Sequence, residues 1–265
     1  MMREERKKEW WKTIFDELYL VTDARSVMSD ELTAREIDFV LEFTGAEEGW
    51  DILDLCGGQG RHAWELYQRG FQNTLVYDYS DYLIKYGKGD CGEAVRFLRG
   101  DARHIGIKDG SFDLVIIMGN SFGYFQDDDE NLKILKEAER VLRRGGTILL
   151  DIVDRDYIVA NFRSRSVHMA DFSKSPRKKS AVTVTRTRNI EEGMVYSREL
   201  VTAKGGGILR DSRYQEKLYG REEISELLES VGFGGLSVEM GKGFHEREGD
   251  FGFMESRMII TGRKV

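Results

Sequence analysis

The residues best suited to chemistry form one short run, Asp54-Leu55-Cys56-Gly57-Gly58-Gln59-Gly60-Arg61, in which an acid precedes a cluster of glycines. The apolar residues before the glycines predict a strand over 51–55, and the following pattern predicts a helix over 61–69. Glycines between a strand and a helix let the backbone turn tightly and approach a ligand closely. The run therefore predicts a ligand site at the end of a strand.

Two classes of ligand fit such a turn. Residues 58–63 match the dinucleotide fingerprint G-x-G-x-x-G/A, and Asp78 follows at a distance suited to holding a ribose, which would indicate a nicotinamide-dependent oxidoreductase. Asp54 argues against that hypothesis, because a carboxylate here would repel a pyrophosphate and would suit a ligand with an amino-acid ammonium group. The sequence also shows no second nucleotide-binding half.

Two further segments place polar residues after predicted strands. Asp101 and Ala102 follow a strand over 95–98; the carboxylate can accept a hydrogen bond from an adenine amino group, and the next amide can serve a ring nitrogen. Asn120 follows the most apolar strand of the chain, over 112–118. Because ligands of doubly wound sheets bind at the carboxyl ends of the strands, these residues are expected to share one site.

The elements that must position these residues alternate between strands and helices, which predicts a parallel sheet covered on both faces. Beyond residue 180 the pattern changes to three successive strands over 181–188, 194–202 and 208–218, followed by a helix over 221–231. The predicted fold class is α/β, with a doubly wound, mostly parallel seven-stranded sheet, an antiparallel last strand and a small antiparallel three-strand insertion. The predicted parts are an N-terminal helical lid (1–45), a main domain (46–160 and 219–265) and the insertion (161–218).

With these motifs the chain resembles the class I (Rossmann-like) S-adenosylmethionine-dependent methyltransferases, strongly over residues 50–155. The run of residues 120–125, Asn-Ser-Phe-Gly-Tyr-Phe, resembles a small-molecule subgroup that includes sugar N-methyltransferases with antiparallel insertions. The resemblance implies S-adenosylmethionine as the cofactor and methyl transfer to an N or O atom of a small molecule. It also implies that Gly57, Gly58 and Gly60 line the methionine part, Asp78 binds the ribose hydroxyls, Tyr79 lies against the adenine, Asp101 holds its amino group and Asn120 lies near the sulfonium.

The remaining candidates concern the acceptor and the entrance. A general base is needed only if the acceptor is a protonated amine or a hydroxyl, and the candidates are Tyr124, His168 and His245. Tyr19, with the tryptophans at positions 10 and 11, is a candidate to close over the cofactor as a lid. The insertion is expected to roof the acceptor pocket or to form a homo-oligomer interface.

The amino-acid composition limits the kinds of partner that the protein is expected to bind. A net charge of −7 opposes a general affinity for polyphosphate, although nine Lys/Arg against two acids lie within 155–188, which keeps an RNA-modifying methyltransferase as an alternative. Two cysteines are too few for a disulfide framework or a zinc site, so no metal is expected. No apolar run approaches a membrane span and the N-terminus lacks a signal peptide, so we expect a cytoplasmic enzyme. A non-enzymatic cofactor-binding subunit is a further alternative.

Overall fold

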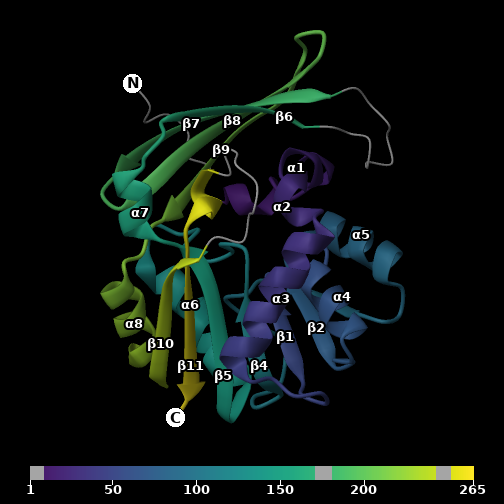
Figure 1. Cartoon of the computed structure of the whole chain (residues 1–265), viewed down its shortest axis with the longest axis vertical. Helices are drawn as coiled ribbons and strands as arrows, with labels where there is room; N and C mark the ends of the chain where they lie inside the picture. The colour runs from purple at the N-terminus through teal and green to yellow at the C-terminus, as the bar shows by residue number, and fades with distance from the viewer. Residues whose placement is uncertain (1–8, 171–180, 243–251) are drawn as a thin grey trace.

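The main sheet of the molecule is a seven-stranded α/β sheet, whose strands lie side by side below the second sheet in Figure 1. The computed structural model describes residues 9–170, 181–242 and 252–265. The strand order is β10-β11-β5-β4-β1-β2-β3, in which β1 to β5 are parallel and β11 is antiparallel to both of its neighbours. The strands are β1 (Ile52–Leu55), β2 (Thr74–Asp78), β3 (Arg96–Arg99), β4 (Phe112–Ile117), β5 (Leu142–Val153), β10 (Phe233–Lys242) and β11 (Arg257–Lys264). The predicted doubly wound sheet with an antiparallel last strand is confirmed.

Helices cover both faces of this sheet because its central strands are apolar on both faces. Leu114 and Ile116 pack with α3 and α4, whereas Val115 and Ile117 point the other way and pack with α6 and α8. This alternation follows from the two-residue period of a strand. None of the helices in the described part of the chain is long and apolar enough to cross a membrane. The helices of the main domain are α3 (Asp30–Thr44), α4 (Arg61–Gln68), α5 (Asp81–Cys91), α6 (Asp128–Val141) and α8 (Arg221–Ser230).

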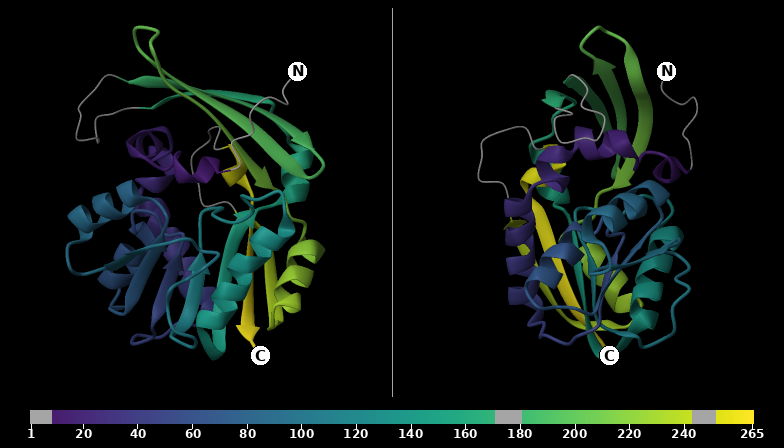
Figure 2. Two further views of the ribbon diagram at one scale, coloured as in Figure 1. Left: turned by 180° about the vertical axis from the view of Figure 1, so that it is seen from behind. Right: turned by 90° about the vertical axis from the view of Figure 1, so that its right-hand side faces the viewer.

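The insertion forms a second, antiparallel sheet that crosses the carboxyl ends of the parallel strands, as both views in Figure 2 show. It has four strands and not the predicted three, in the order β6 (Arg165–Ala170), β7 (Val182–Glu191), β8 (Met194–Ala203) and β9 (Ile208–Lys217). The extra strand, β6, pairs with β7 through six residue pairs. Its sequence, Arg-Ser-Val-His-Met-Ala, has too little apolar alternation to predict a strand. It follows the short helix α7 (Arg155–Ala160).

Two apolar contacts anchor the inner face of the insertion sheet. At one end Val182, Val184 and Val201 pack against Val21 of α1 (Glu17–Thr22). At the other end Val195 packs with Val153 and Ile158. An antiparallel sheet of this size needs such cover, because it buries only one face. The polar side chains between the two anchors are therefore held over the main sheet.

The N-terminal segment differs from what its sequence predicts, because apolar residues at helical spacing over 3–20 indicate one continuous amphipathic helix. Residues 3–8 of that range lie outside the described part of the chain. A single turn of 3-10 helix, η1 (Trp10–Lys12), precedes α1, and α2 (Ala24–Val27) follows it. Asp16 ends the extended stretch between η1 and α1 by accepting hydrogen bonds from the backbone N–H groups of Leu18 and Tyr19. A side chain that caps a helix start favours a new helix over a continuing one, and the hydrophobic period alone did not reveal this break.

Candidate functional site

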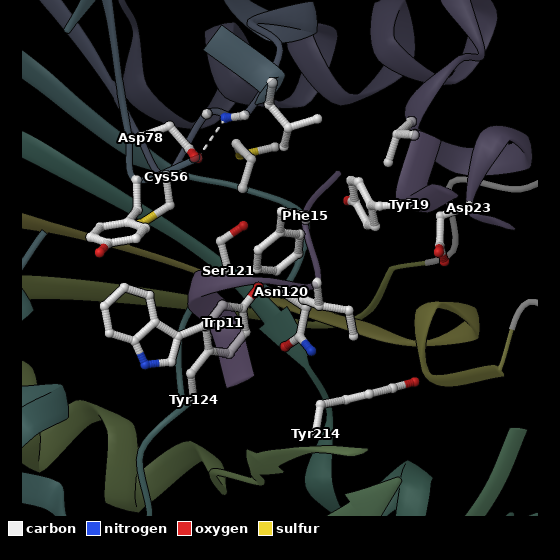
Figure 3. Close-up of a pocket in the computed structure, with 18 of the residues that line it drawn as sticks. Trp11, Phe15, Tyr19, Asp23, Cys56, Asp78, Asn120, Ser121, Tyr124 and Tyr214 are labelled. Carbon is white, nitrogen blue, oxygen red and sulfur yellow. Dashed lines mark hydrogen bonds between the residues drawn. The ribbon is translucent and has the colours of Figure 1, made fainter. Parts of the chain in front are cut away.

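The carboxyl ends of β1, β2 and β4 border a cavity of about 260 Å³. Its walls come from the glycine turn, the N-terminal segment and the inner face of the insertion sheet. Figure 3 shows Asp78 and Cys56 at one side, Tyr19 and Asp23 at another, and Tyr214 of β9 across from them. This is where ligands of doubly wound sheets bind. The lining includes nine of the ten predicted cofactor residues: Tyr19, Asp54, Gly57, Gly58, Asp78, Tyr79, Asp101, Ala102 and Asn120.

Asp54 is a fully buried carboxylate whose oxygens have no hydrogen-bond partner among the described residues. Burial raises its pKa to about 7. Gly57 lies directly above it, and a Cβ there would come closer than 3.0 Å to all three carboxyl atoms. An unsatisfied buried carboxylate beneath a bare backbone is suited to a ligand that brings a positive charge and hydrogen-bond donors. The ammonium group of S-adenosylmethionine has both the positive charge and the hydrogen-bond donors that this carboxylate requires.

The loops at the cavity adopt backbone conformations that most residues avoid. Cys56 and Asn120 have φ values of 62° and 59°, and Glu192 is the only other non-glycine residue with a positive φ in the described part of the chain. Both loop residues line the cavity, whereas Glu192 lies in a turn between β7 and β8. Left-handed backbone at non-glycine residues costs free energy and concentrates at functional sites. The two strained positions mark the glycine turn and the Asn120 loop as parts of one site.

Asp78 ends β2 and faces the cavity from beside the glycine turn. Its two carboxylate oxygens accept hydrogen bonds from the Gly58 N–H at 2.9 Å and the Ser80 N–H at 2.7 Å, the first of which is drawn in Figure 3. Burial raises its pKa despite these bonds. Because a carboxylate has about four lone-pair positions, Asp78 keeps capacity for two hydroxyl donors. The geometry fits the predicted ribose contact.

Asp101 lines the cavity, but its carboxylate is already bound by Arg103. The guanidinium donates to both oxygens, with a shortest distance of 2.6 Å, and the Arg103 N–H donates at 3.0 Å. Burial opposes ionisation of Asp101, yet the bonds from Arg103 outweigh it and lower its pKa. Arg103 also lies over the rings of Trp11 and Phe125, at 5.3 and 4.8 Å from their centroids. The predicted adenine contact of Asp101 would thus be shared with Arg103, a residue that the sequence did not single out.

Aromatic side chains close the cavity from the N-terminal side. Trp11 packs edge-on against Tyr79, with ring centroids 4.6 Å apart, and Trp10 packs against Tyr124 at 4.7 Å. The indole N–H groups of Trp10 and Trp11 are buried without a hydrogen-bond partner among the described residues. Since a buried indole N–H usually finds an acceptor, these donors are suited to contacts with bound ligands. The arrangement is consistent with the predicted lid, in which Tyr19 also lines the cavity.

The three candidate bases are placed differently from one another. Tyr124 lines the cavity, but burial raises its pKa well above the ordinary value, so its hydroxyl stays protonated at neutral pH and is unsuited to act as a base. His168 lies on β6, where its Nε2 is 2.9 Å from the backbone oxygen of Thr22, and it is not part of the cavity wall. His168 therefore links the insertion to the N-terminal segment. His245 lies outside the described residues.

Gly60 is the predicted cofactor residue that the cavity wall does not include. It precedes α4 with a φ of 77°, and a Cβ there would lie 2.7 Å from the Phe97 ring. Its lack of a side chain serves the close packing of α4 on β2 and β3, which is the role of the third glycine in nucleotide-binding turns. Gly60 thus contributes to the shape of the turn through packing on the side away from the cavity.

The insertion contributes charged residues that could not be assigned to the site from their sequence positions. Arg186, Arg210 and Glu216 line the cavity together with Glu199. Arg186 donates to Asp23 at 2.8 Å and to Glu199 at 2.8 Å, and Arg210 donates to Glu199 at 3.3 Å. All four point inward because they occupy alternate positions on neighbouring strands. Knowing the strand register would have revealed them, but their sequence positions alone do not.

The basic stretch over 155–188 does not form a continuous outward face in its described part. Arg186 and Arg188 line the cavity. Arg155 pairs with Asp156 and Glu223, at 3.1 and 3.2 Å. Lys174 and residues 177–179 lie outside the described residues. Arg163 and Arg165 are exposed, and Arg163 lies 3.8 Å from Glu255. The described arginines are thus divided between the cavity wall and the surface, so they do not form the single basic face that the RNA-modifying alternative needs.

A buried ionic network supports the Asn120 loop from below. Arg257 of β11 is fully buried and donates to Asp151 at 2.6 Å and to Glu36 at 3.3 Å. The other oxygen of Asp151 accepts from the Gly119 N–H at 2.9 Å. Burial opposes the charge on Glu36, but Arg61, His62 and Arg257 outweigh it and hold its pKa well below the usual range. The network therefore connects α3, α4 and β11 to a loop of the cavity.

The unsatisfied carboxylate of Asp54 is expected to lower the stability of the ligand-free protein. Its folded pKa of about 7 exceeds the unfolded value of about 3.9, so its ionisation destabilises the ligand-free fold as pH rises between these values. Because each unit of pKa shift corresponds to ~1.4 kcal/mol, Asp54→Asn should raise the free energy of unfolding at pH 8 by up to about 4 kcal/mol while weakening binding of S-adenosylhomocysteine, the demethylated cofactor. Urea unfolding measures the first effect. At pH 4 the two proteins should be equally stable, and a variant that is less stable at pH 8 would contradict this assignment.

Comparisons with known proteins agree with this site. Residues 52–146 match the family described as a methyltransferase domain. A Bacillus subtilis protein named as a methyltransferase, YqeM, is 25% identical over 185 residues, 69% of this chain and 72% of its own. The demethylmenaquinone methyltransferase of Renibacterium salmoninarum is 32% identical over 140 residues, 52% of this chain. This chain spans only 56% of that enzyme.

Solved structures extend the likeness to nearly the whole chain. An S-adenosylmethionine-dependent methyltransferase from Clostridium acetobutylicum has a TM-score of 0.69 at 18% identity, over 93% of this chain and 96% of its own. CalS10 of Micromonospora echinaspora, an amino pentose methyltransferase solved with S-adenosylmethionine bound, has a TM-score of 0.63 at 14% identity, over 89% and 92%. At these identities the likeness shows the fold alone. Taken with the match over residues 52–146 and the named relatives, it shows that the chain contains a methyltransferase domain and has the class I fold of S-adenosylmethionine-dependent methyltransferases.

Proposed function

We propose that the protein moves the methyl group of S-adenosylmethionine to an N or O atom of a small molecule that binds between the glycine turn and the insertion sheet. The observation that carries this proposal is the polar inner face of β7, β8 and β9, which forms one wall of the same cavity as Asp54 and Asp78. A wall of arginines and carboxylates is suited to a polar acceptor.

The chain's own residues would orient the reactants and exclude water. When bound, the cofactor supplies a methyl group on a positively charged sulfur, which is reactive enough that no covalent enzyme intermediate is needed. Asp54 and the backbone of Gly57 are placed to hold the amino-acid part of the cofactor. Asp78 is placed to hold its ribose. The aromatic lid around Trp10 and Tyr124 and the inner face of the insertion sheet would hold the acceptor in line and keep the site dry.

The names of the relatives bear on the acceptor in different ways. CalS10 is named an amino pentose methyltransferase and KedS8 a sugar N-methyltransferase, whereas the demethylmenaquinone methyltransferases bear the name of a quinone substrate. The cavity has an aromatic side and a charged side, and a quinone ring has no charged group that would pair with the arginines and carboxylates of the charged side. We therefore favour a polar acceptor with a nitrogen or oxygen atom.

Incubation with methyl-labelled S-adenosylmethionine and a cell extract tests the proposal. The label should enter the small-molecule fraction with wild-type protein and not with Asp78→Ala. The exposed-site variant Asp90→Ala should behave like the wild type, because Asp90 lies at the far end of α5. Label that enters only the RNA fraction would replace the proposed function by the RNA-modifying alternative.

A further inference from the structure

Asn120 joins the cofactor side of the cavity to the insertion, and the orientation of its amide is fixed. Its Oδ1 accepts a hydrogen bond from the Val153 N–H at 3.2 Å, so its Nδ2 must face the other way. Nδ2 donates to Oε1 of Glu216 at 3.2 Å. The backbone N–H of Asn120 donates a hydrogen bond to the backbone carbonyl oxygen of Asp151 at 3.0 Å. Because Val153 fixes the amide oxygen of Asn120, the amide nitrogen always faces Glu216 as a donor. This hydrogen bond holds Oε1 of Glu216 in place.

Glu216 keeps its second oxygen for another partner. No hydrogen bond to Oε2 occurs among the described residues, and Glu216 lines the cavity. Burial raises its pKa to about 7, and the nearby arginines only partly offset this effect. The titratable and charged groups that influence Glu216 or are influenced by it come from three sides: Arg186 and Arg188 of β7, Asp23 after α1, and Tyr124 and Tyr214.

The charges on this wall leave a place for one cation. Arg186 lies between Asp23 and Glu199, and Arg210 lies between Glu199 and Asp16. Arg186 and Arg210 thus each already contact two carboxylates, whereas no ion pair joins Glu216 to a cation among the described residues. A positively charged acceptor would pair with the ionised Glu216 carboxylate, whereas an anionic acceptor would be repelled by it.

We infer that the acceptor is an amine and that Glu216 binds its ammonium group and takes the proton that the nitrogen must lose. This inference rests on the proposed function and names the acceptor class of the same site. One N–H bond of the ammonium breaks and its proton passes to Oε2, which leaves a lone pair on nitrogen. That lone pair forms the new N–C bond while the C–S bond breaks with its electron pair on sulfur.

The competing groups are less suited to this role. Tyr124 stays protonated at neutral pH, and His168 lies outside the cavity wall. An alcohol would not need Glu216 in the same way, because a carboxylate is far too weak a base to ionise a hydroxyl before transfer. A carboxylate that titrates near neutral pH is well matched to an ammonium proton.

A panel of primary amines and alcohols with matched carbon skeletons tests the inference, including cyclohexylamine with cyclohexanol and glucosamine with glucose. Methyl transfer from labelled S-adenosylmethionine and affinity for the protein saturated with S-adenosylhomocysteine are measured for each. Amines should be methylated on nitrogen and should bind at least tenfold more tightly than their alcohols. Transfer should rise between pH 6 and pH 8 as Glu216 ionises.

Variants assign the effect to Glu216. Glu216→Gln should remove the preference for amines, lower transfer at least tenfold and flatten its pH profile, with affinity for S-adenosylhomocysteine within twofold of wild type. Glu216→Asp should recover part of the transfer. Glu226→Gln, at an exposed position of α8, is the matched control and should behave as wild type.

The possible outcomes distinguish a failure of the amine assignment from a failure of the proposed function. Methylation of the alcohols, methylation on carbon, or no methylation of any panel member by protein that binds S-adenosylhomocysteine would overturn the amine assignment. An amine preference that survives in Glu216→Gln would also overturn it. Failure to bind S-adenosylhomocysteine at all would instead contradict the proposed function.

Discussion

Arg257→Met should lower the free energy of unfolding by about 3–5 kcal/mol. Arg257 is fully buried between Asp151 and Glu36, both of which are themselves fully buried. Burial lowers the pKa of Arg257 to about 10, so the guanidinium still carries its charge at neutral pH. Removing one partner of a buried ionic group leaves the other charges uncompensated, which costs far more than losing a surface pair. Urea unfolding monitored by circular dichroism measures the change.

Arg263→Met is the matched control for this variant. Arg263 lies on the same strand, β11, but is exposed, so its replacement should change stability by less than about 0.5 kcal/mol. If Arg257→Met proved as stable as Arg263→Met, the buried network would not be the support of the Asn120 loop that its geometry indicates. Glu36 would keep Arg61 and His62 as partners, so Asp151 is the group expected to suffer most.

Gly57→Ala should weaken binding of S-adenosylhomocysteine by roughly a hundredfold, or ~3 kcal/mol. A Cβ at this position would meet the Asp54 carboxylate closer than real contacts allow, so either the turn or Asp54 must shift. Both are placed to hold the amino-acid end of the cofactor. Calorimetric titration measures the loss of affinity, and the unfolding transition shows whether the variant still folds.

Gly89→Ala provides the comparison, because the same chemical change occurs where nothing lies within 4 Å of the added carbon. Gly89 is in the interior of α5, where alanine is the better helix former by ~1 kcal/mol. This variant should bind the cofactor product as wild type does and should be slightly more stable. Equal affinities for Gly57→Ala and Gly89→Ala would place the ligand away from the glycine turn.

The main sheet could be predicted because its signals are local. Each of the segments over 51–55, 75–78 and 112–118 is apolar on both faces and is closed by glycine or polar residues, as a buried parallel strand requires. Helix caps are local signals too: the Ser80 hydroxyl precedes α5 and accepts a hydrogen bond from the Leu83 N–H at 3.1 Å. Asp54, Asp78 and Asn120 could be brought together from sequence because parallel strands end at one edge.

The acceptor side could not be predicted because it depends on contacts between distant parts of the chain. Glu216 and Asn120 are 96 residues apart, and only the antiparallel register of β8 and β9 turns Glu216 inward. Strand β6 is specified by pairing with β7 and by packing near α1, and not by its own composition. The position of His168 outside the cavity wall could not be predicted for the same reason, since its partner Thr22 lies 146 residues away.

Calorimetric titration of S-adenosylhomocysteine into wild-type protein and Asp78→Ala tests the central claim most directly, since the claim is that this cofactor binds between Asp54 and Asp78. The wild type should bind one equivalent, and Asp78→Ala should bind about thirtyfold more weakly, ~2 kcal/mol, because two hydroxyl hydrogen bonds to a carboxylate are lost. NAD should give no binding signal. Tight binding of NAD without a response to S-adenosylhomocysteine would contradict the account, as would an Asp78→Ala protein that folds and binds S-adenosylhomocysteine with unchanged affinity.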